Sequence, residues 1–268
     1  MKKKKIRGAF IWLCILIAMM IIATAVNLLG EKEDGIEVSG GTAGKDWAFA
    51  NPGLLKVRSD DVTISGTADA DLKIECEGAS QLTIRNLKQK NHKLYIFSTD
   101  DFTVNVEGNN DLVWISGWES VTVRGQNRDA ELTLSEKASG KNLSVENVKA
   151  CAELFDAEKD INIMGNSAIT VKKVSDEEDV AADVRVKAGR YININLSPGG
   201  SVTVETGDGL LPFLAEKKMT LGKNNEILTP ENGVVEGENT PYGPNCYFVF
   251  DEDGDWGTDV VIKNTAKE

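Results

Sequence analysis

Residues 101–150 read DFTVNVEGNNDLVWISGWESVTVRGQNRDAELTLSEKASGKNLSVENVKA. Apolar and polar residues alternate in short runs such as FTV, VTV and LSV, and glycine or asparagine follows each run within a few residues. Alternation with a period of two is the pattern of a strand that buries one face. Glycine and asparagine tolerate the positive φ that a sharp corner requires. The stretch therefore predicts short strands separated by tight turns.

The same run recurs through most of the chain. Each copy starts at a polar residue and continues apolar–polar–apolar, and the leading positions are Asp61, Gln81, Asp101, Ser120, Asn142, Asp160, Asp183 and Ser201. These positions lie 18 to 23 residues apart and average 20. A second short strand is predicted in the middle of most repeats, so that each repeat contains two strands and two turns. A fixed period of this length is typical of solenoids, in which stacked repeats bury one another's apolar faces.

We therefore predict an all-β fold, a right-handed parallel β-helix or solenoid of about eight coils of ~20 residues over 61–207. Residues 46–60 are expected to form an N-terminal cap and residues 208–268 a C-terminal cap or small β module, because a bare coil would expose a sheet edge. An antiparallel β-sandwich is the alternative, since its strands also recur every 8–12 residues or so.

Residues 1–30 predict membrane targeting. Five basic residues lie within 1–7, and residues 9–29 are nearly all apolar. A helix of that length reaches ~30 Å, the thickness of the bilayer core. The positive charge before the span predicts that the N-terminus lies inside the cell and the rest on the extracellular face of the membrane. The triplet ATA at 23–25 also fits a signal-peptidase site, so secretion after cleavage behind Ala25 is the alternative to an uncleaved transmembrane anchor.

The chain beyond residue 30 is acidic, with 25 Lys and Arg against 42 Asp and Glu, a net charge of −17. Such a surface repels phosphate backbones, so we expect no nucleic-acid partner. Residues 31–45 are polar and glycine-rich, which predicts a flexible linker. The remaining cysteines, Cys76, Cys151 and Cys246, are odd in number, which leaves free thiols or a single bridge as alternatives.

Aromatic residues supply the candidate ligand-binding site. Tyr95 and Trp114 lie 19 residues apart, in the second strands of neighbouring repeats, so they are predicted to stack in one column. With Trp118 they form the candidate site, because flat and rigid aromatic side chains bind the faces of sugar rings well. Packing within the core is the alternative role for these residues.

An acidic turn near the C-terminus contains the candidate metal ligands Asp251, Asp253, Asp255 and Asp259. Oxygen-rich loops bind Ca²⁺. The helix–loop–helix calcium pattern counted from Asp251 requires glycine at position 6 and glutamate at position 12, but this chain has Trp256 and Ile262 there. A β-hairpin turn between strands at 247–250 and 258–263 fits this stretch better. Calcium is therefore the alternative, and we expect no other cofactor.

No catalytic residues are expected. Cleavage of a glycan by paired carboxyls needs two of them at a defined separation. Asp61 and Asp101 occupy equivalent positions two coils apart, roughly 10 Å at ~4.8 Å per coil, with Gln81 between them. We interpret these residues as corner residues that hydrogen-bond the local backbone. An enzyme acting on glycans from a β-helix stays an alternative.

The C-terminal stretch LGKNNEILTPENGVVEGENTPYGPNCYFVFDEDGDWGTDVVIKN, residues 221–264, contains a TPE–G segment, a D-x-D-G turn and a final T-x-VVI strand. It resembles the closing segment of β-helical repeat proteins on the surface of Gram-positive gut bacteria, some of which are labelled carbohydrate-binding. The runs FTVNVEGNND and VTVRGQNRDAELTLS resemble repeats of those proteins. The resemblance implies a surface-exposed β-helix and transfers no catalytic residue.

Taken with the aromatic residues, these features predict a non-enzymatic module for binding or adhesion at the cell surface, with a glycan or a surface protein as partner. A structural spacer of the cell envelope is the alternative function.

Overall fold

The computed structural model describes residues 31–33, 35–174, 184–207, 210–240, 243–250 and 259–266. The regular secondary structure within these ranges is all β, running from β1 to β26. No helix in this part of the chain is long and apolar enough to cross a membrane. The predicted anchor or signal segment at 9–29 lies outside the described residues.

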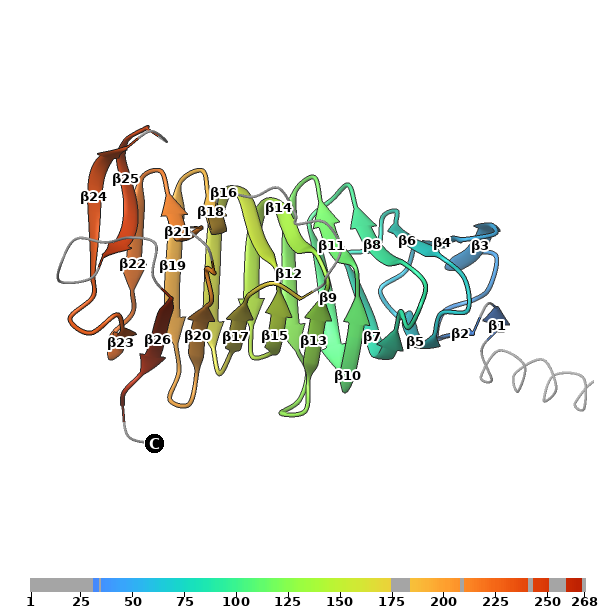
Figure 1. Ribbon diagram of the computed structural model, residues 1–268. Coiled ribbons are helices and arrows are strands. Elements are labelled where there is room, and N and C mark those ends of the chain that lie inside the picture. Colours follow the sequence, from blue (N-terminus) through green and yellow to red (C-terminus); the bar gives the residue numbers. More distant parts are fainter. Residues whose placement is uncertain are drawn as a thin grey trace, which may run out of the picture.

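Most of the described strand pairings are parallel, and they place the strands in three rows along an elongated body (Figure 1). Row A contains β5 (Thr63–Thr67), β7 (Gln81–Lys88), β9 (Phe102–Glu107), β12 (Ser120–Gly125), the second halves of β14 (Lys137–Glu146) and β16 (Leu154–Gly165), β19 (Tyr191–Leu196) and β22 (Lys218–Leu221). Row B contains β10 (Asn109–Leu112), β13 (Glu131–Leu134), β15 (Lys149–Ala152), β17 (Ala168–Val171) and β20 (Ser201–Val204). Row C contains β4 (Leu54–Val57), β6 (Leu72–Cys76), β8 (Leu94–Ser98), β11 (Trp114–Gly117), the first halves of β14 and β16, β18 (Val184–Ala188) and β21 (Leu211–Ala215).

From β9 to β22 the chain passes repeatedly from row A to row B to row C and back to row A. We call one such passage a circuit. The expectation of an all-β protein is confirmed, and the predominantly parallel pairing disagrees with the antiparallel β-sandwich.

Strand register keeps like residues above like. In row A, Val121 pairs with Leu143, and Leu143 pairs with Ile161, and all three side chains are buried. The residues between them on each strand point outward, because side chains alternate along a strand. The apolar positions of the repeat thus form continuous columns in one core. This stacking removes from water a face that a single circuit could not cover.

Three features differ from the sequence-based predictions. A full circuit contains three strands rather than the predicted two. From β10 onward, the segment before each row C strand forms a separate short strand, and these short strands pair with one another as row B. The copies that begin at Asp183 and Ser201 belong to rows C and B, and the row A strand of that circuit is β19. Because β17 ends at Val171 and β18 begins only at Val184, the phase of the repeat shifts here, while the same alternation occurs in every row. The predicted linker 31–45 contains β2 (Ile36–Ser39), which pairs with β5.

Antiparallel strands lie at both ends of the parallel rows. At the N-terminal end, β1 (Glu31–Glu33) pairs with β2, β2 covers β5, and β3 (Trp47–Asn51) covers β4. At the C-terminal end, β26 (Val260–Asn264) covers β20 and also pairs with β23 (Asn225–Thr229). There, β25 (Gly243–Phe250) lies between β21 and β24 (Val234–Thr240). Such strands cover edges that would otherwise template pairing with another chain.

Buried asparagines tie neighbouring circuits together. The side-chain oxygen of Asn110, which is fully buried, accepts a hydrogen bond from the backbone amide of Leu87 at 2.9 Å. Its Nδ2 donates to the carbonyl oxygens of Glu107 and Gly108 at 3.0 and 3.2 Å, and to that of Glu131 in the following circuit at 3.3 Å. Asn225 plays an equivalent part near the C-terminal end, where its Oδ1 accepts from the backbone amide of Leu196 at 2.7 Å.

Candidate functional site

The outer surface of row C carries a cluster of aromatic side chains. Tyr95 on β8 is the register partner of Trp114 on β11, and their ring centroids lie 4.8 Å apart with planes inclined by 40°. Both residues are half-buried, so the protein covers each of them only in part. The structure therefore places the two rings in contact in one column, as the spacing of 19 residues predicted.

A second aromatic pair lies beside the first. Trp118, in the turn after β11, is 68% exposed, and its ring meets that of Phe97 edge-on at 5.8 Å. Phe97 is two residues beyond Tyr95 on β8, so it points to the same outer surface. The sequence analysis did not include Phe97 in the candidate site, although Phe97 occupies the next outward-facing position after Tyr95 on the same strand. We call Tyr95, Phe97, Trp114 and Trp118 the aromatic face.

Polar side chains border the aromatic face on both sides. The Nζ of Lys73 lies 5.0 Å from the centroid of the Phe97 ring and 2.6 Å from Oε1 of Glu75. On the other side, the hydroxyl oxygens of Ser116 and Ser139 are 2.9 Å apart. Flat apolar rings beside hydrogen-bonding groups suit a ligand that has both apolar faces and hydroxyls.

Two of the leading polar residues of the repeat, Asp101 and Asp160, bind groups of the next circuit. Oδ1 of Asp101 accepts a hydrogen bond from the backbone amide of Ser120 at 3.0 Å. Bonds from that amide and from the Ser120 side chain hold the pKa of Asp101 below its ordinary range. Asp160 binds Arg190, with Oδ1 3.0 Å from Nε. A lowered pKa is the opposite of what a general acid at neutral pH needs, so the Asp101 carboxylate suits a structural role better than catalysis.

Most of the predicted calcium loop, including Asp251, Asp253 and Asp255, lies outside the described residues. Asp259 is described, and its Oδ1 accepts a hydrogen bond from the backbone amide of Thr206 at 2.8 Å. Among the described residues, no three histidine, cysteine or acidic side chains are grouped closely enough to hold a metal ion.

The sequence left open whether the cysteines form a disulfide bridge. Of the described cysteines, Cys76 and Cys151 are free thiols. Cys76 is buried in row C, and desolvation raises the pKa of its thiol. Cys151 is half-buried at the outer surface of row B, where partial burial also raises its pKa. Burial therefore keeps both thiols protonated and weakly nucleophilic near neutral pH. The side chain of Cys246 is outside the described residues.

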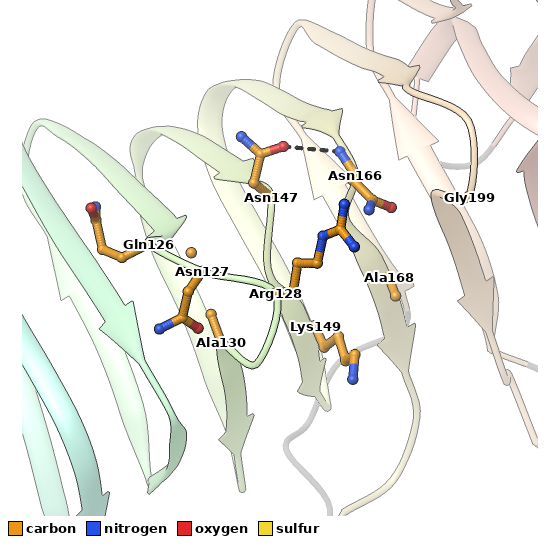
Figure 2. Close-up of a pocket in the computed structure, with 10 residues that line it drawn as sticks. Gln126, Asn127, Arg128, Ala130, Asn147, Lys149, Asn166, Ala168 and Gly199 are labelled. Atoms are coloured by element: carbon orange, nitrogen blue, oxygen red, sulfur yellow. Dashed lines mark hydrogen bonds between the residues drawn. The ribbon is translucent and has the colours of Figure 1, made fainter. Parts of the chain in front are cut away.

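A groove of about 600 Å³ lies where row A turns into row B (Figure 2). It is lined by Gly125, Gln126, Asn127, Arg128, Ala130, Asn147, Lys149, Asn166, Ala168 and Gly199. These residues come from the corners of successive circuits. Sequence reasoning did not find this groove, because it depends on how corners of unequal length lie side by side.

No model of a known protein family matches this chain, and neither the curated proteins nor the solved structures contain a match to it.

Proposed function

We propose that this chain is a non-enzymatic binding or adhesion module of a bacterial cell surface, with a glycan as its ligand. Its finer architecture would be a right-handed parallel β-solenoid whose coils are the circuits described above. The apolar segment at 9–29 would anchor it on the extracellular face of the membrane, or would be removed and leave the protein secreted.

The aromatic face carries the proposal. Its four rings lie at the outer surface, and one of them, Trp118, is 68% exposed. Keeping a tryptophan in water forgoes the free energy that its burial would contribute, roughly 25 cal/mol per Å² of apolar surface. A ligand that covers the indole ring recovers this contribution. The C–H faces of sugar rings are flat enough to stack on it, and the hydroxyls at their rims can bond to Lys73 and Ser116, which border the face.

The experiment is a glycan-array measurement on the full-length chain. A detergent without a sugar headgroup keeps the chain in solution, because residues 9–29 are apolar and a glycoside detergent would compete for the site. We expect saturable binding that weakens at least about tenfold in Trp114→Ala and in Trp118→Ala, equivalent to ~1.4 kcal/mol of binding free energy.

The matched control is Tyr191→Ala, which removes an aromatic side chain that is 38% exposed but lies on row A. We expect this variant to bind as the wild type does. Loss of binding in all three variants would point to a general defect of the protein. Binding that survives in both tryptophan variants would exclude the aromatic face as the site. Repeating the array with and without Ca²⁺ tests the calcium alternative at 251–259.

A structural spacer is the second candidate function. On the outer surface of row A, ion pairs connect neighbouring circuits, with Nε of Arg85 2.6 Å from Oε2 of Glu107 and Nε of Arg124 2.8 Å from Oε2 of Glu146. A stiff stack with a charged surface suits a spacer that holds other components away from the membrane. Absence of binding to every glycan on the array would favour this function.

A further inference from the structure

The groove of Figure 2 arises from corners of unequal length between rows A and B. The connections at 126–130 and 197–200 are long, and the two connections between them, at 147–148 and 166–167, are short. The long corners form its walls and the short ones its floor. Three strand spacings of ~4.8 Å separate the two long corners, about 14 Å in all.

The floor and one wall offer hydrogen-bond donors. Oδ1 of Asn147 accepts a hydrogen bond from the backbone amide of Asn166 at 2.9 Å, which leaves both hydrogens of its side-chain NH₂ group available. Oδ1 of Asn127 is likewise used by the backbone amide of Asp129 at 3.0 Å. In both side chains the acceptor is engaged by the protein, so a ligand meets chiefly donors.

Two cations add to these donors. Arg128 extends from its corner toward Asn166, and Lys149 lies below it (Figure 2). Within the described part of the chain, no carboxylate lies within 4.0 Å of the Arg128 guanidinium, whereas Arg85 and Arg124 each bind a glutamate of the next circuit. Lys149 forms an ion pair with Glu131, with Nζ 3.0 Å from Oε1.

The lining residues of the groove thus include two cationic side chains and no acidic one. This is unusual in a chain whose net charge beyond residue 30 is −17. Two cations surrounded by amide donors favour an anionic ligand.

The groove continues onto the outer surface of row B. A shallower hollow of about 270 Å³ adjoins it and shares Lys149 and Ala168 with it. Its lining includes Glu131, the ion-pair partner of Lys149, together with hydroxyl-bearing residues such as Thr133 and Thr170. A single inorganic anion would fill only the part near Arg128, whereas a short chain of linked rings would fill both.

We propose that the groove binds a uronic-acid residue of an acidic glycan. Arg128 and Lys149 bind its carboxylate, and the amide side chains of Asn127 and Asn147 bind its hydroxyls. Neighbouring sugar residues extend over the hollow on row B. This inference rests on the proposed function in assuming a glycan ligand, but it assigns a second site, separate from the aromatic face on row C.

The test is isothermal titration calorimetry of the full-length chain in the sugar-free detergent. The probes are the trisaccharide of galacturonic acid and the same trisaccharide with its carboxyls converted to methyl esters. The two differ mainly in charge at the carboxyl position. We expect the acid to bind at least about tenfold more tightly than the ester, and this preference to decrease as salt is added.

Arg128→Gln is expected to weaken binding of the acid at least about tenfold and to leave binding of the ester unchanged, because glutamine keeps donors but loses the charge. Arg85→Gln is the matched control, since it removes an exposed arginine from row A, and it is expected to change the affinity less than about twofold. Far-ultraviolet circular dichroism verifies that both variants fold.

Equal affinity for acid and ester, no binding of the acid, or an unchanged affinity in Arg128→Gln would each overturn the proposal. The two sites can be told apart. Binding of the acid that persists in Trp118→Ala and is lost in Arg128→Gln supports the groove even if the aromatic face binds nothing. Glycan binding that depends on Trp118 alone overturns the groove and leaves the proposed function standing.

Discussion

Asn110 links three successive circuits, and its replacement by alanine tests whether buried amide side chains hold the stack together. The substitution removes the acceptor of the Leu87 amide, and residue 87 is fully buried. Leaving such a donor unpaired costs about 1–3 kcal/mol. The two hydrogens of Nδ2 serve the carbonyl oxygens of Glu107, Gly108 and Glu131, and losing their bonds costs roughly 0.5–1.5 kcal/mol for each hydrogen. The carbonyl oxygens that lose their Asn110 bonds keep a second lone pair for other partners. We therefore take the lower part of the total of these costs. We expect Asn110→Ala to lower the free energy of unfolding by about 3 kcal/mol.

Urea unfolding of the full-length chain, followed by circular dichroism, measures this loss. A stacked array can unfold in parts, so hydrogen exchange at the Leu87 amide is measured as well. A loss of about 3 kcal/mol corresponds to exchange roughly a hundredfold faster at that amide. Asn109→Ala is the matched control, because Asn109 is the preceding residue and its side chain is exposed. We expect the control to change the free energy of unfolding by less than about 0.5 kcal/mol.

Equal stability of the two variants would refute the reasoning, as would an unchanged exchange rate at the Leu87 amide in Asn110→Ala. Either result would mean that water or a shift of the backbone replaces the lost acceptor. The continuous apolar columns would then hold adjacent circuits together without help from the asparagine.

Three further predictions follow from single residues. Gly165→Ala should lower Tm by at least about 3 °C more than Gly44→Ala, because both glycines have positive φ (67° and 79°) but only at Gly165 would the new Cβ collide, at 2.2 Å, with a neighbouring side-chain oxygen. Equal Tm values would show that the neighbour moves aside at no cost. Two variants are compared, one that keeps Cys151 but not Cys76 and one that keeps Cys76 but not Cys151. Maleimide should label Cys151 in the folded state and Cys76 only after unfolding. Its raised pKa should shift the labelling of Cys151 to higher pH than that of a free thiol, and rapid native labelling of Cys76 would contradict its burial. The folded-state pKa of Asp101 lies below its ordinary value of 3.8, so this carboxylate contributes stability above that pH and the contribution is lost as the pH falls through the folded-state pKa. Urea midpoints at pH 5 and about pH 2.5 should therefore differ less in Asp101→Asn than in the wild type, and an equal difference would rule out this contribution.

The aromatic face was largely predictable from the sequence. Tyr95 and Trp114 could be paired because their spacing matched the period of the repeat, and Phe97 follows from the alternation within one strand. The groove was not predictable, because its walls and floor come from corners of four circuits. Which described residues of adjacent circuits lie beside Arg128, and that none of them places a carboxylate within 4.0 Å of it, depends on the register.

Alternation and period were sufficient to determine an all-β chain of stacked strands and the side chains that point inward. They did not determine how many strands make a circuit, nor the rows to which the strands starting at 184 and 201 belong. Alternation records only that one face of a strand is buried, and this holds equally in rows A, B and C. The register between circuits, and with it the groove, is decided by long-range backbone pairing and by the lengths of the corners, which act only when the chain has folded back on itself.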